Sequence, residues 1–183
     1  MDNGAGSYRR FLNGEESAFD EIMQAYFHSL VFFIDRYVHD VSTAEDIAMD
    51  VFVELIVHKH RYNFQVTLKA YLFMLGRSRA LDWLKHQRVL QFTDLSQVPE
   101  LSDDSLALEE QLAWDEKKRA VDRAIRTLPE DMQTAVYLVY FEQLSYEQAA
   151  KVMKKNRKQV DNLLYRAKKA LRGLLEKDGE QLC

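Results

Sequence analysis

The chain of 183 residues is poor in the residues that interrupt or cross-link a fold, with six glycines, two prolines and one cysteine. Cys183 has no second cysteine in the chain with which to form a disulfide bond. No apolar run approaches the roughly 18 residues of a membrane-spanning helix, and the N-terminal residues lack the apolar core of a signal peptide. These absences predict a cytoplasmic protein without a membrane span and with few helix breakers.

The motifs of common enzyme classes are missing as well. The sequence contains no glycine-rich phosphate-binding loop and no nucleophile motif. Among five histidines only His58 and His60 are close together, and no cysteine or acidic residue stands beside them at metal-ligand spacing. We therefore expect no catalytic residues, no metal site and no cofactor.

Charge is segregated along the chain, although the net charge is only −4. Residues 2–54 hold eleven acidic residues against three arginines, whereas residues 59–88 hold seven basic residues against one aspartate. Residues 93–116 contain eight acidic residues and no basic one, and residues 145–177 contain ten basic against three acidic. This alternation predicts basic surfaces for nucleic acid and an acidic surface for a different partner.

Apolar residues with helical spacing predict helices at 15–37, 43–58 and 67–87. Ser42 or Thr43 is the expected N-cap of the second of these, which should bury one face including Ile56. Its other face shows Asp46, Asp50 and Glu54 at a spacing of four residues, an acidic ridge that either is solvated or binds a basic partner.

The apolar pattern fades after residue 89, in a segment rich in loop-forming residues. Helical spacing resumes at 117–127 and again after Pro129, which suits the start of a helix. The predicted fold is thus all-α, with a helical domain at 1–90, an acidic linker at 91–116 and a second helical domain at 117–183.

The C-terminal part carries two capping-box patterns, Ser145 with Gln148 and Asn156 with Gln159. They predict a short helix, a break at Met153–Lys155 and a longer helix from about residue 157. Two helices joined by a tight break are typical of a helix-turn-helix.

The longer helix has one apolar stripe and an opposite face rich in cations and amides, which suits a DNA major groove. A solvated basic helix is the alternative, and the doubled capping pattern favours DNA binding. The candidate DNA-binding residues of this helix are Arg157, Lys158, Gln159, Asn162, Tyr165, Arg166 and Lys169.

Between the second and third helices, residues 59–65 alternate cations with aromatic residues. Aromatic rings stack on unpaired bases while cations bind the phosphates, so this loop is a candidate for single-stranded DNA. Alternatively, Tyr62 and Phe64 are buried in the core.

Taken together, the chain resembles a bacterial RNA polymerase sigma factor of the extracytoplasmic-function type, in which only the second and fourth conserved regions are present. The resemblance rests on the order and spacing of several short motifs. They are Ala18-Phe19, Ala44-Glu45-Asp46-Ile47 with Asp50-Val51-Phe52, Tyr71-Leu72, Ala80-Leu81-Asp82-Trp83-Leu84-Lys85, Leu128-Pro129, Leu144 to Ala150, and Tyr165 to Arg172.

The resemblance implies a protein that performs no chemistry but gives core RNA polymerase its promoter specificity. The second helix would bind the clamp coiled coil of the β′ subunit, and the C-terminal helix-turn-helix would read the −35 element and touch the β flap. An anti-sigma factor is a further possible partner. The implied polymerase-binding residues are Asp46, Met49, Asp50 and Glu54, and the implied −10 residues are Arg61, Tyr62, Asn63, Phe64, Arg77, Arg79, Trp83 and Lys85.

Several residues depart from this pattern, and three of them lie in or near the turn and recognition helix of the helix-turn-helix. The turn of the helix-turn-helix usually carries a glycine where Lys154 stands and an apolar residue where Lys155 stands, so Lys154 is expected to adopt a left-handed or otherwise strained conformation at some cost. Asp161 on the outer face opposes phosphate. A different class of protein, a stand-alone helix-turn-helix regulator with an N-terminal sensing or dimerisation bundle, accounts for the C-terminal half but not for the acidic ridge and basic loop.

Overall fold

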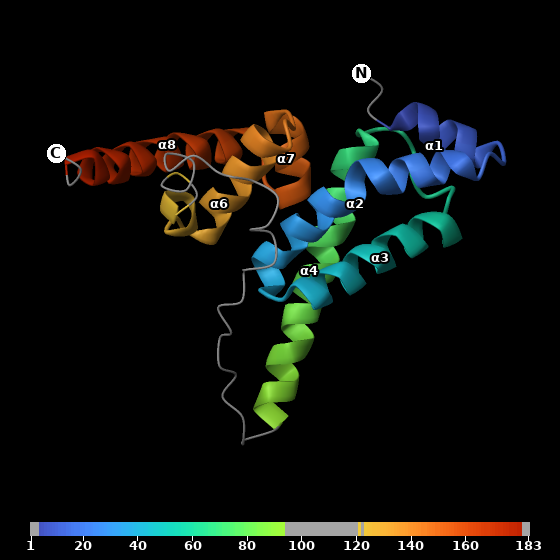
Figure 1. The fold of residues 1–183 in the computed structure, drawn as a ribbon, viewed down its shortest axis with the longest axis horizontal. Coiled ribbons are helices and arrows are strands. Elements are labelled where there is room, and N and C mark those ends of the chain that lie inside the picture. The colour runs from blue at the N-terminus through green and yellow to red at the C-terminus, as the bar shows by residue number, and fades with distance from the viewer. Residues whose placement is uncertain (1–3, 94–120, 122, 181–183) are drawn as a thin grey trace. The chain divides into compact units, whose positions relative to one another are not determined.

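The computed structural model describes residues 4–93, 121 and 123–180. The chain divides into two compact units, Met1–Leu108 and Glu109–Cys183. Every regular element in the described residues is a helix (Figure 1), which confirms the all-α prediction. None of the helices found there combines the length and the hydropathy that crossing a bilayer requires.

The described part of the first unit contains four helices: α1 (Ala5–Leu12), α2 (Ser17–Val38), α3 (Val41–Val57) and α4 (Leu68–Thr93). The three helices expected from periodicity correspond to α2, α3 and α4. Helix α2 packs against each of the other three, so its apolar faces form the centre of this unit. The predicted linker 91–116 lies outside the described residues except for 91–93, which belong to α4.

Helices α2 and α4 approach closely at Gly76. A Cβ atom at this position would lie 2.8 Å from Leu30 Cδ1. Nearby, the rings of Phe33 and Phe73 pack with their centroids 4.8 Å apart. The missing side chain therefore lets the two helices share one dense core.

Helix α3 begins two residues after the left-handed His39, which ends α2. The prediction that Ser42 or Thr43 is the N-cap of α3 is wrong. Asp40 has the extended backbone of an N-cap, and its carboxylate accepts a hydrogen bond from the Thr43 N–H at 2.8 Å. An aspartate two or three residues upstream satisfies a free helix N–H as well as a serine does.

Helix α1 was not expected from the sequence, and tertiary contacts hold it. Tyr8 is fully buried, and its hydroxyl donates to the Lys59 carbonyl at 2.7 Å. Gly4 caps the helix with φ 75°, and a Cβ there would lie 2.7 Å from Tyr26 Oη. This short N-terminal helix is thereby fastened to the segment that follows α3.

The described part of the second unit contains helical residues 123–126, then α6 (Glu130–Val136), a π-helical turn η1 (Tyr137–Phe141), α7 (Tyr146–Met153) and α8 (Arg157–Glu180). Pro129 is the N-cap of α6, as its position after Leu128 suggested. Helix α8 packs on α6 and α7. The apolar stripe of α8, including Val160, Leu164 and Ala167, is buried in this core.

Both predicted capping boxes are present around the turn between α7 and α8. The Ser145 hydroxyl accepts from the Gln148 N–H at 3.2 Å, and the Gln148 side chain accepts from the Ser145 N–H at 2.8 Å. Asn156 and Gln159 exchange the equivalent pair of hydrogen bonds, each 2.8 Å long. These reciprocal bonds fix where each helix starts, and they confirm the helix-turn-helix.

The turn itself tolerates its two unusual lysines in different ways. Lys154 adopts the expected left-handed conformation, with φ 53° and ψ 42°. Lys155 extends its ammonium group to Asp131 at 2.9 Å, so a charged pair replaces the expected apolar contact. A left-handed non-glycine residue costs about 1–2 kcal/mol, which the surrounding caps and core must offset.

Candidate nucleic-acid and protein-binding surfaces

The outer side of α8 presents the predicted DNA-binding side chains to solvent. We call this surface the recognition face, and all of its members are exposed, with Tyr165 exposed to 70%. Asp161 is exposed on the same helix. The recognition face consists of Arg157, Lys158, Gln159, Asn162, Tyr165, Arg166 and Lys169.

Two members of the recognition face also have partners within the unit. The Gln159 carboxamide oxygen accepts the Asn156 N–H, which leaves its NH₂ group for an outside acceptor. Arg157 Nε lies 3.1 Å from Glu147 Oε1, in a pair exposed on both sides. Such an exposed pair is worth less than about 1 kcal/mol, so Arg157 can exchange it for a phosphate.

Lys168 is exposed on α8 beside the recognition face and contacts another element of the unit. Its ammonium nitrogen lies 5.4 Å from the centre of the Tyr140 ring. A hydrogen bond with Tyr140 raises the pKa of Lys168 above its ordinary value. This lysine therefore links α8 to the π-helical turn.

The segment between α3 and α4, residues 58–67, forms the basic loop. Tyr62 was expected to be an exposed aromatic residue, and this is wrong because it is 3% exposed. Its ring contacts those of Tyr8 and Tyr71 at centroid distances of 5.2 and 5.1 Å, and its hydroxyl donates to the Val66 carbonyl at 2.7 Å. Burial raises the Tyr62 pKa. The alternative prediction, that the Tyr62 ring is buried in the core, is confirmed.

Phe64 is the half-buried aromatic residue of the basic loop. Its backbone is left-handed, with φ 61°, and its ring touches Tyr62 at 4.7 Å between centroids. The guanidinium of Arg9 lies 4.9 Å from its ring centre. The exposed Asn63 accepts the Gln65 N–H at 3.1 Å, which shapes the turn.

The four predicted residues of α4 lie on different sides of the helix. Arg79 and Lys85 are exposed, whereas Arg77 and Trp83 are half-buried. Arg77 and Arg79 are two residues apart and therefore point roughly 200° away from each other around the helix. Arg79 shares its side of α4 with Trp83, four residues on. The structure thus separates Arg77 and Lys85 from Arg79 and Trp83.

Glu54 joins the basic loop to α4. Its two carboxylate oxygens bind Arg61 at 2.8 Å and Arg79 at 2.6 Å, and only 12% of its side chain is exposed. The hydrogen bond from Arg79 is the largest of the effects that lower the Glu54 pKa. The expectation of an acidic ridge with three free carboxylates is therefore wrong at Glu54, which orients two cations of the predicted −10 set.

Replacing Glu54 by glutamine is expected to destabilise the first unit by about 1 kcal/mol at neutral pH, since the amide offers one acceptor oxygen to two arginines and its NH₂ group cannot accept from either. A lowered folded-state pKa stabilises the fold above the unfolded pKa, and this contribution is lost as pH falls through the folded value. The free-energy difference from wild type should hence be constant at neutral pH, decline below the ordinary glutamate pKa and vanish below the lowered folded-state pKa. Urea unfolding across pH measures it, with the exposed Glu45→Gln as a control expected to change little.

The exposed side of α3 combines two carboxylates with apolar side chains. Asp46 and Asp50 are exposed, and between and beside them Met49, Val53 and Ile56 are each exposed to between 45% and 47%. Ile56 was expected to be buried, and this is wrong. We call these five residues the α3 docking face.

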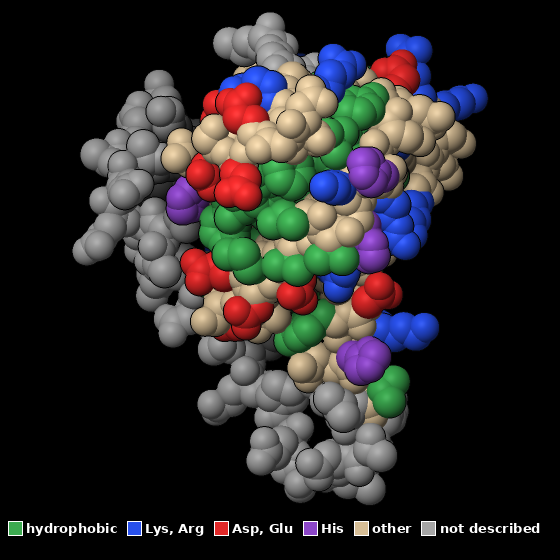
Figure 2. Space-filling view, turned by 90° about the vertical axis from the view of Figure 1, so that its right-hand side faces the viewer, with side chains coloured by type: hydrophobic (Ala, Val, Ile, Leu, Met, Phe, Trp, Pro, Cys, Tyr) green, Lys and Arg blue, Asp and Glu red, His purple; other side chains and the backbone are tan. Residues whose placement is uncertain are grey.

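A mixed surface of this kind is typical of a protein-binding site, because apolar side chains gain from burial and carboxylates select a basic partner. On the face of the first unit drawn in Figure 2, hydrophobic side chains lie beside acidic ones. The sequence analysis missed Val53 and Ile56, although their spacing from Met49, four and seven residues, marks one side of a helix. Val57, next to Ile56, is exposed to 65% and extends the apolar area.

Both units match families of known proteins. Residues 22–89 match the family described as Sigma-70 region 2, and residues 118–171 match the family described as Sigma-70, region 4. The first match covers α3, the basic loop and most of α4, and the second covers the helix-turn-helix.

Individual relatives align along most of the chain. The RNA polymerase sigma-H factor of Pseudomonas aeruginosa is 28% identical, over 88% of this chain and 88% of its own. The ECF RNA polymerase sigma factor SigM of Bacillus subtilis is 26% identical, over 85% of this chain and 93% of its own. Among solved structures, the sigma factor RpoE of Bartonella quintana, in complex with the anti-sigma factor NepR, has a TM-score of 0.69 at 20% identity, covering 86% of this chain and 96% of that one.

Proposed function

Because the chain belongs to the sigma-70 family of RNA polymerase sigma factors, in its extracytoplasmic-function group, we propose that its three surfaces divide the work of transcription initiation. As a member of this family it is a transcription initiation factor and not an enzyme. It binds core RNA polymerase and directs initiation at specific promoters. The assignment of each task to particular residues is our proposal.

The α3 docking face binds the clamp coiled coil of the β′ subunit. Asp46 and Asp50 pair with basic residues of the clamp, while Met49 and Val53 supply the apolar contact area at the centre. The observation that supports this role is the exposure of these four side chains on a single helix face. Glu54 has a different task, since its carboxylate already holds Arg61 and Arg79.

The basic loop and the adjoining side of α4 bind the −10 element and help to separate its strands. Phe64 stacks on an unpaired base, and Arg61 and Arg79, fixed by Glu54, bind the nearby phosphates. Asn63 is placed to hydrogen-bond a base edge. Tyr62 supports the loop from below and does not itself stack on DNA, because its ring is buried.

The recognition face of α8 reads the −35 element as a duplex, and the second unit also touches the β flap. Arg166 and Lys169 bind phosphates, and Asn162 and the free NH₂ of Gln159 reach base edges in the major groove. We place the protein in the cytoplasm, where polymerase and promoter DNA are found. The Bartonella quintana relative was solved with an anti-sigma factor, and we propose that a protein of this kind holds the present chain inactive.

The observation that carries the proposal is the combination, in the described residues, of an acidic and apolar helix face with cationic surfaces on both units. The decisive experiment is in vitro transcription of genomic DNA by core polymerase with and without the purified chain, followed by mapping of start sites. New start sites that share −10 and −35 sequences are the expected result. A dimer that binds duplex DNA and leaves the polymerase unaffected would instead identify a stand-alone regulator.

A further inference from the structure

Arg9 lies outside every residue set assigned above, yet it covers the aromatic ring of the basic loop. It is exposed on α1, and its guanidinium carbon is 4.9 Å from the centre of the Phe64 ring. Its neighbour Arg10 points elsewhere and binds Glu15, at 2.8 Å, and Glu21. Of two adjacent arginines, one is thus neutralised by carboxylates, and the other stacks on a ring.

The position of Arg9 over the loop is set by the buried residue before it. Tyr8 donates its hydroxyl to the Lys59 carbonyl at 2.7 Å and packs edge-on against Tyr62 and Phe64, with centroids 5.2 and 6.1 Å away. Burial raises the pKa of this hydroxyl to about 12, so it remains a donor. Residues more than fifty positions apart in sequence are therefore held together, and α1 forms one wall of the basic loop.

We propose that Arg9 is a further DNA-binding residue of the first unit, which binds the phosphate next to the base stacked on Phe64. This inference rests on the proposed function of the basic loop. A guanidinium is planar, so it can remain stacked on an aromatic ring while its N–H groups bind phosphate oxygens at its edge. The occupant is single-stranded DNA, because Phe64 offers a ring to an unpaired base and the loop adds Lys59 and Arg61 as cations.

The charge surrounding Arg9 favours this assignment. The carboxylates of the neighbouring elements are already used, Glu21 and Glu15 by Arg10 and Glu54 by Arg61 and Arg79. A phosphate that enters beside Phe64 thus meets cations without facing a free carboxylate from this group. A cation–π contact at an exposed site is worth only about 0.5–1 kcal/mol, which lets the guanidinium adjust when DNA arrives.

The test uses holoenzyme reconstituted from core polymerase and the full chain, and a fluorescent single-stranded oligonucleotide with the non-template −10 sequence found by start-site mapping. Arg9→Ala is expected to weaken binding about threefold to tenfold and to reduce the slope of log K against log salt by about 0.7. Arg9→Lys should restore the slope but only part of the affinity, since an ammonium does not stack as a plane. Arg88→Ala removes an exposed cation of α4 that belongs to none of the assigned residue sets, and it is the matched control, expected to bind within about twofold of wild type.

Unchanged affinity of Arg9→Ala would overturn the proposal, and so would tighter binding, which would identify Arg9 as a cover over Phe64. Phe64→Ala separates this failure from that of the proposed function. If Phe64→Ala weakens binding and Arg9→Ala does not, only the role of Arg9 is wrong. If neither weakens binding, the basic loop is not the −10 site. Circular dichroism melting of each variant checks that the fold is retained.

Discussion

Holoenzyme assembly is expected to fail when Asp46 and Asp50 are both replaced by lysine, with core polymerase bound at least about a hundredfold more weakly. Removing one partner of a desolvated interfacial charge pair costs about 2–5 kcal/mol, and reversing its sign adds repulsion. A hundredfold loss corresponds to only about 2.7 kcal/mol. Two reversals on one helix face therefore exceed that threshold even when each is partly screened.

The same change should leave the fold intact. Both aspartates are exposed in the middle of α3, on the side opposite its buried residues. Two lysines one turn apart repel each other about as much as the two aspartates they replace, by about 0.2–0.5 kcal/mol in an isolated helix, and lysine has the higher helix propensity. The thermal unfolding midpoint of the variant is expected to be equal to that of wild type or slightly higher.

Core affinity is measured by competition with wild-type protein for purified core polymerase. The charge-matched control is Asp20→Lys with Asp82→Lys, because these two aspartates are exposed on α2 and α4. The control is expected to retain wild-type affinity within about threefold, since a general charge effect is screened over a Debye length of about 8–10 Å. If both double variants bind the core equally well, the α3 docking face is not the polymerase-binding surface.

Local patterns in the sequence were sufficient to predict the helix-turn-helix. A capping box involves residues three apart, so the sequence alone predicts the hydrogen bonds between Ser145 and Gln148 and between Asn156 and Gln159. The left-handed conformation of Lys154 follows from the same local geometry, because a chain leaving one capped helix for another must turn sharply there. Hydrophobic periodicity is likewise a local pattern, and it predicted α2, α3 and α4.

The errors arose where contacts between distant segments decide the outcome. Helix α1 has eight residues, too few to be stable alone, and it forms because Tyr8 reaches Lys59. Tyr62 is buried because that same helix covers it. Neither contact produces a hydrophobic periodicity in the sequence, and the helix and strand propensities of these residues do not predict it.

On α3, the sequence predicted the acidic residues but not which of them form ion pairs. Three acidic residues at a spacing of four residues appear equivalent on a helix, yet Glu54 binds Arg61 and Arg79 while Asp46 and Asp50 remain exposed. The difference depends on where the basic loop folds back against α4. Ile56 was misplaced for a related reason, since α3 has more apolar residues than its neighbours can cover.

Loss of −35 binding and loss of its salt dependence should appear together when Arg166 and Lys169 are replaced by alanine. Both side chains are exposed on α8, whereas Val160 and Leu164 hold that helix to the core. Each phosphate contact to duplex DNA contributes about 0.9 to the slope of log K against log salt. The double variant should therefore reduce the slope by about 1.8 and the affinity by roughly tenfold or more at low salt.

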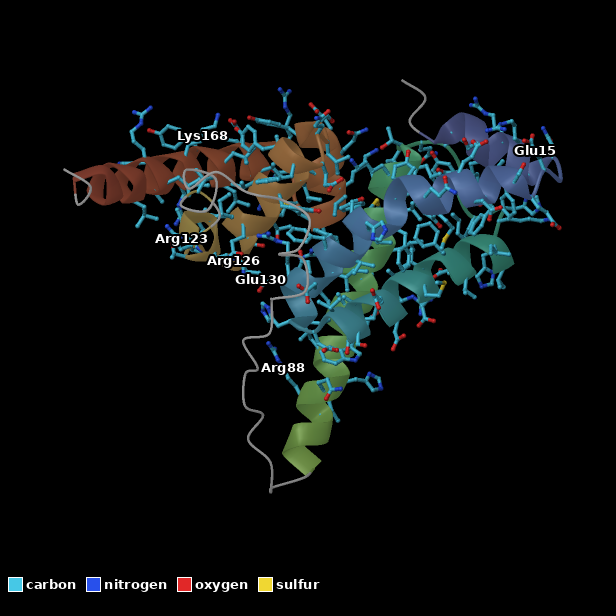
Figure 3. All side chains as sticks on the ribbon, in the orientation of Figure 1. Glu15, Arg88, Arg123, Arg126, Glu130 and Lys168 are labelled. Carbon is cyan, nitrogen blue, oxygen red and sulfur yellow. The ribbon has the colours of Figure 1, made fainter. Side chains whose placement is uncertain are left out.

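The measurement is a salt titration of a duplex with the −35 element identified by start-site mapping, compared with a duplex in which that element is scrambled. Because phosphate contacts carry no sequence information, both duplexes should lose affinity in similar proportion. Arg123→Ala with Arg126→Ala, which removes two cations of the same unit before α6 (Figure 3), is the charge-matched control. An equal slope for the two double variants would mean that this unit attracts DNA only through its overall charge, and that α8 does not lie in the groove.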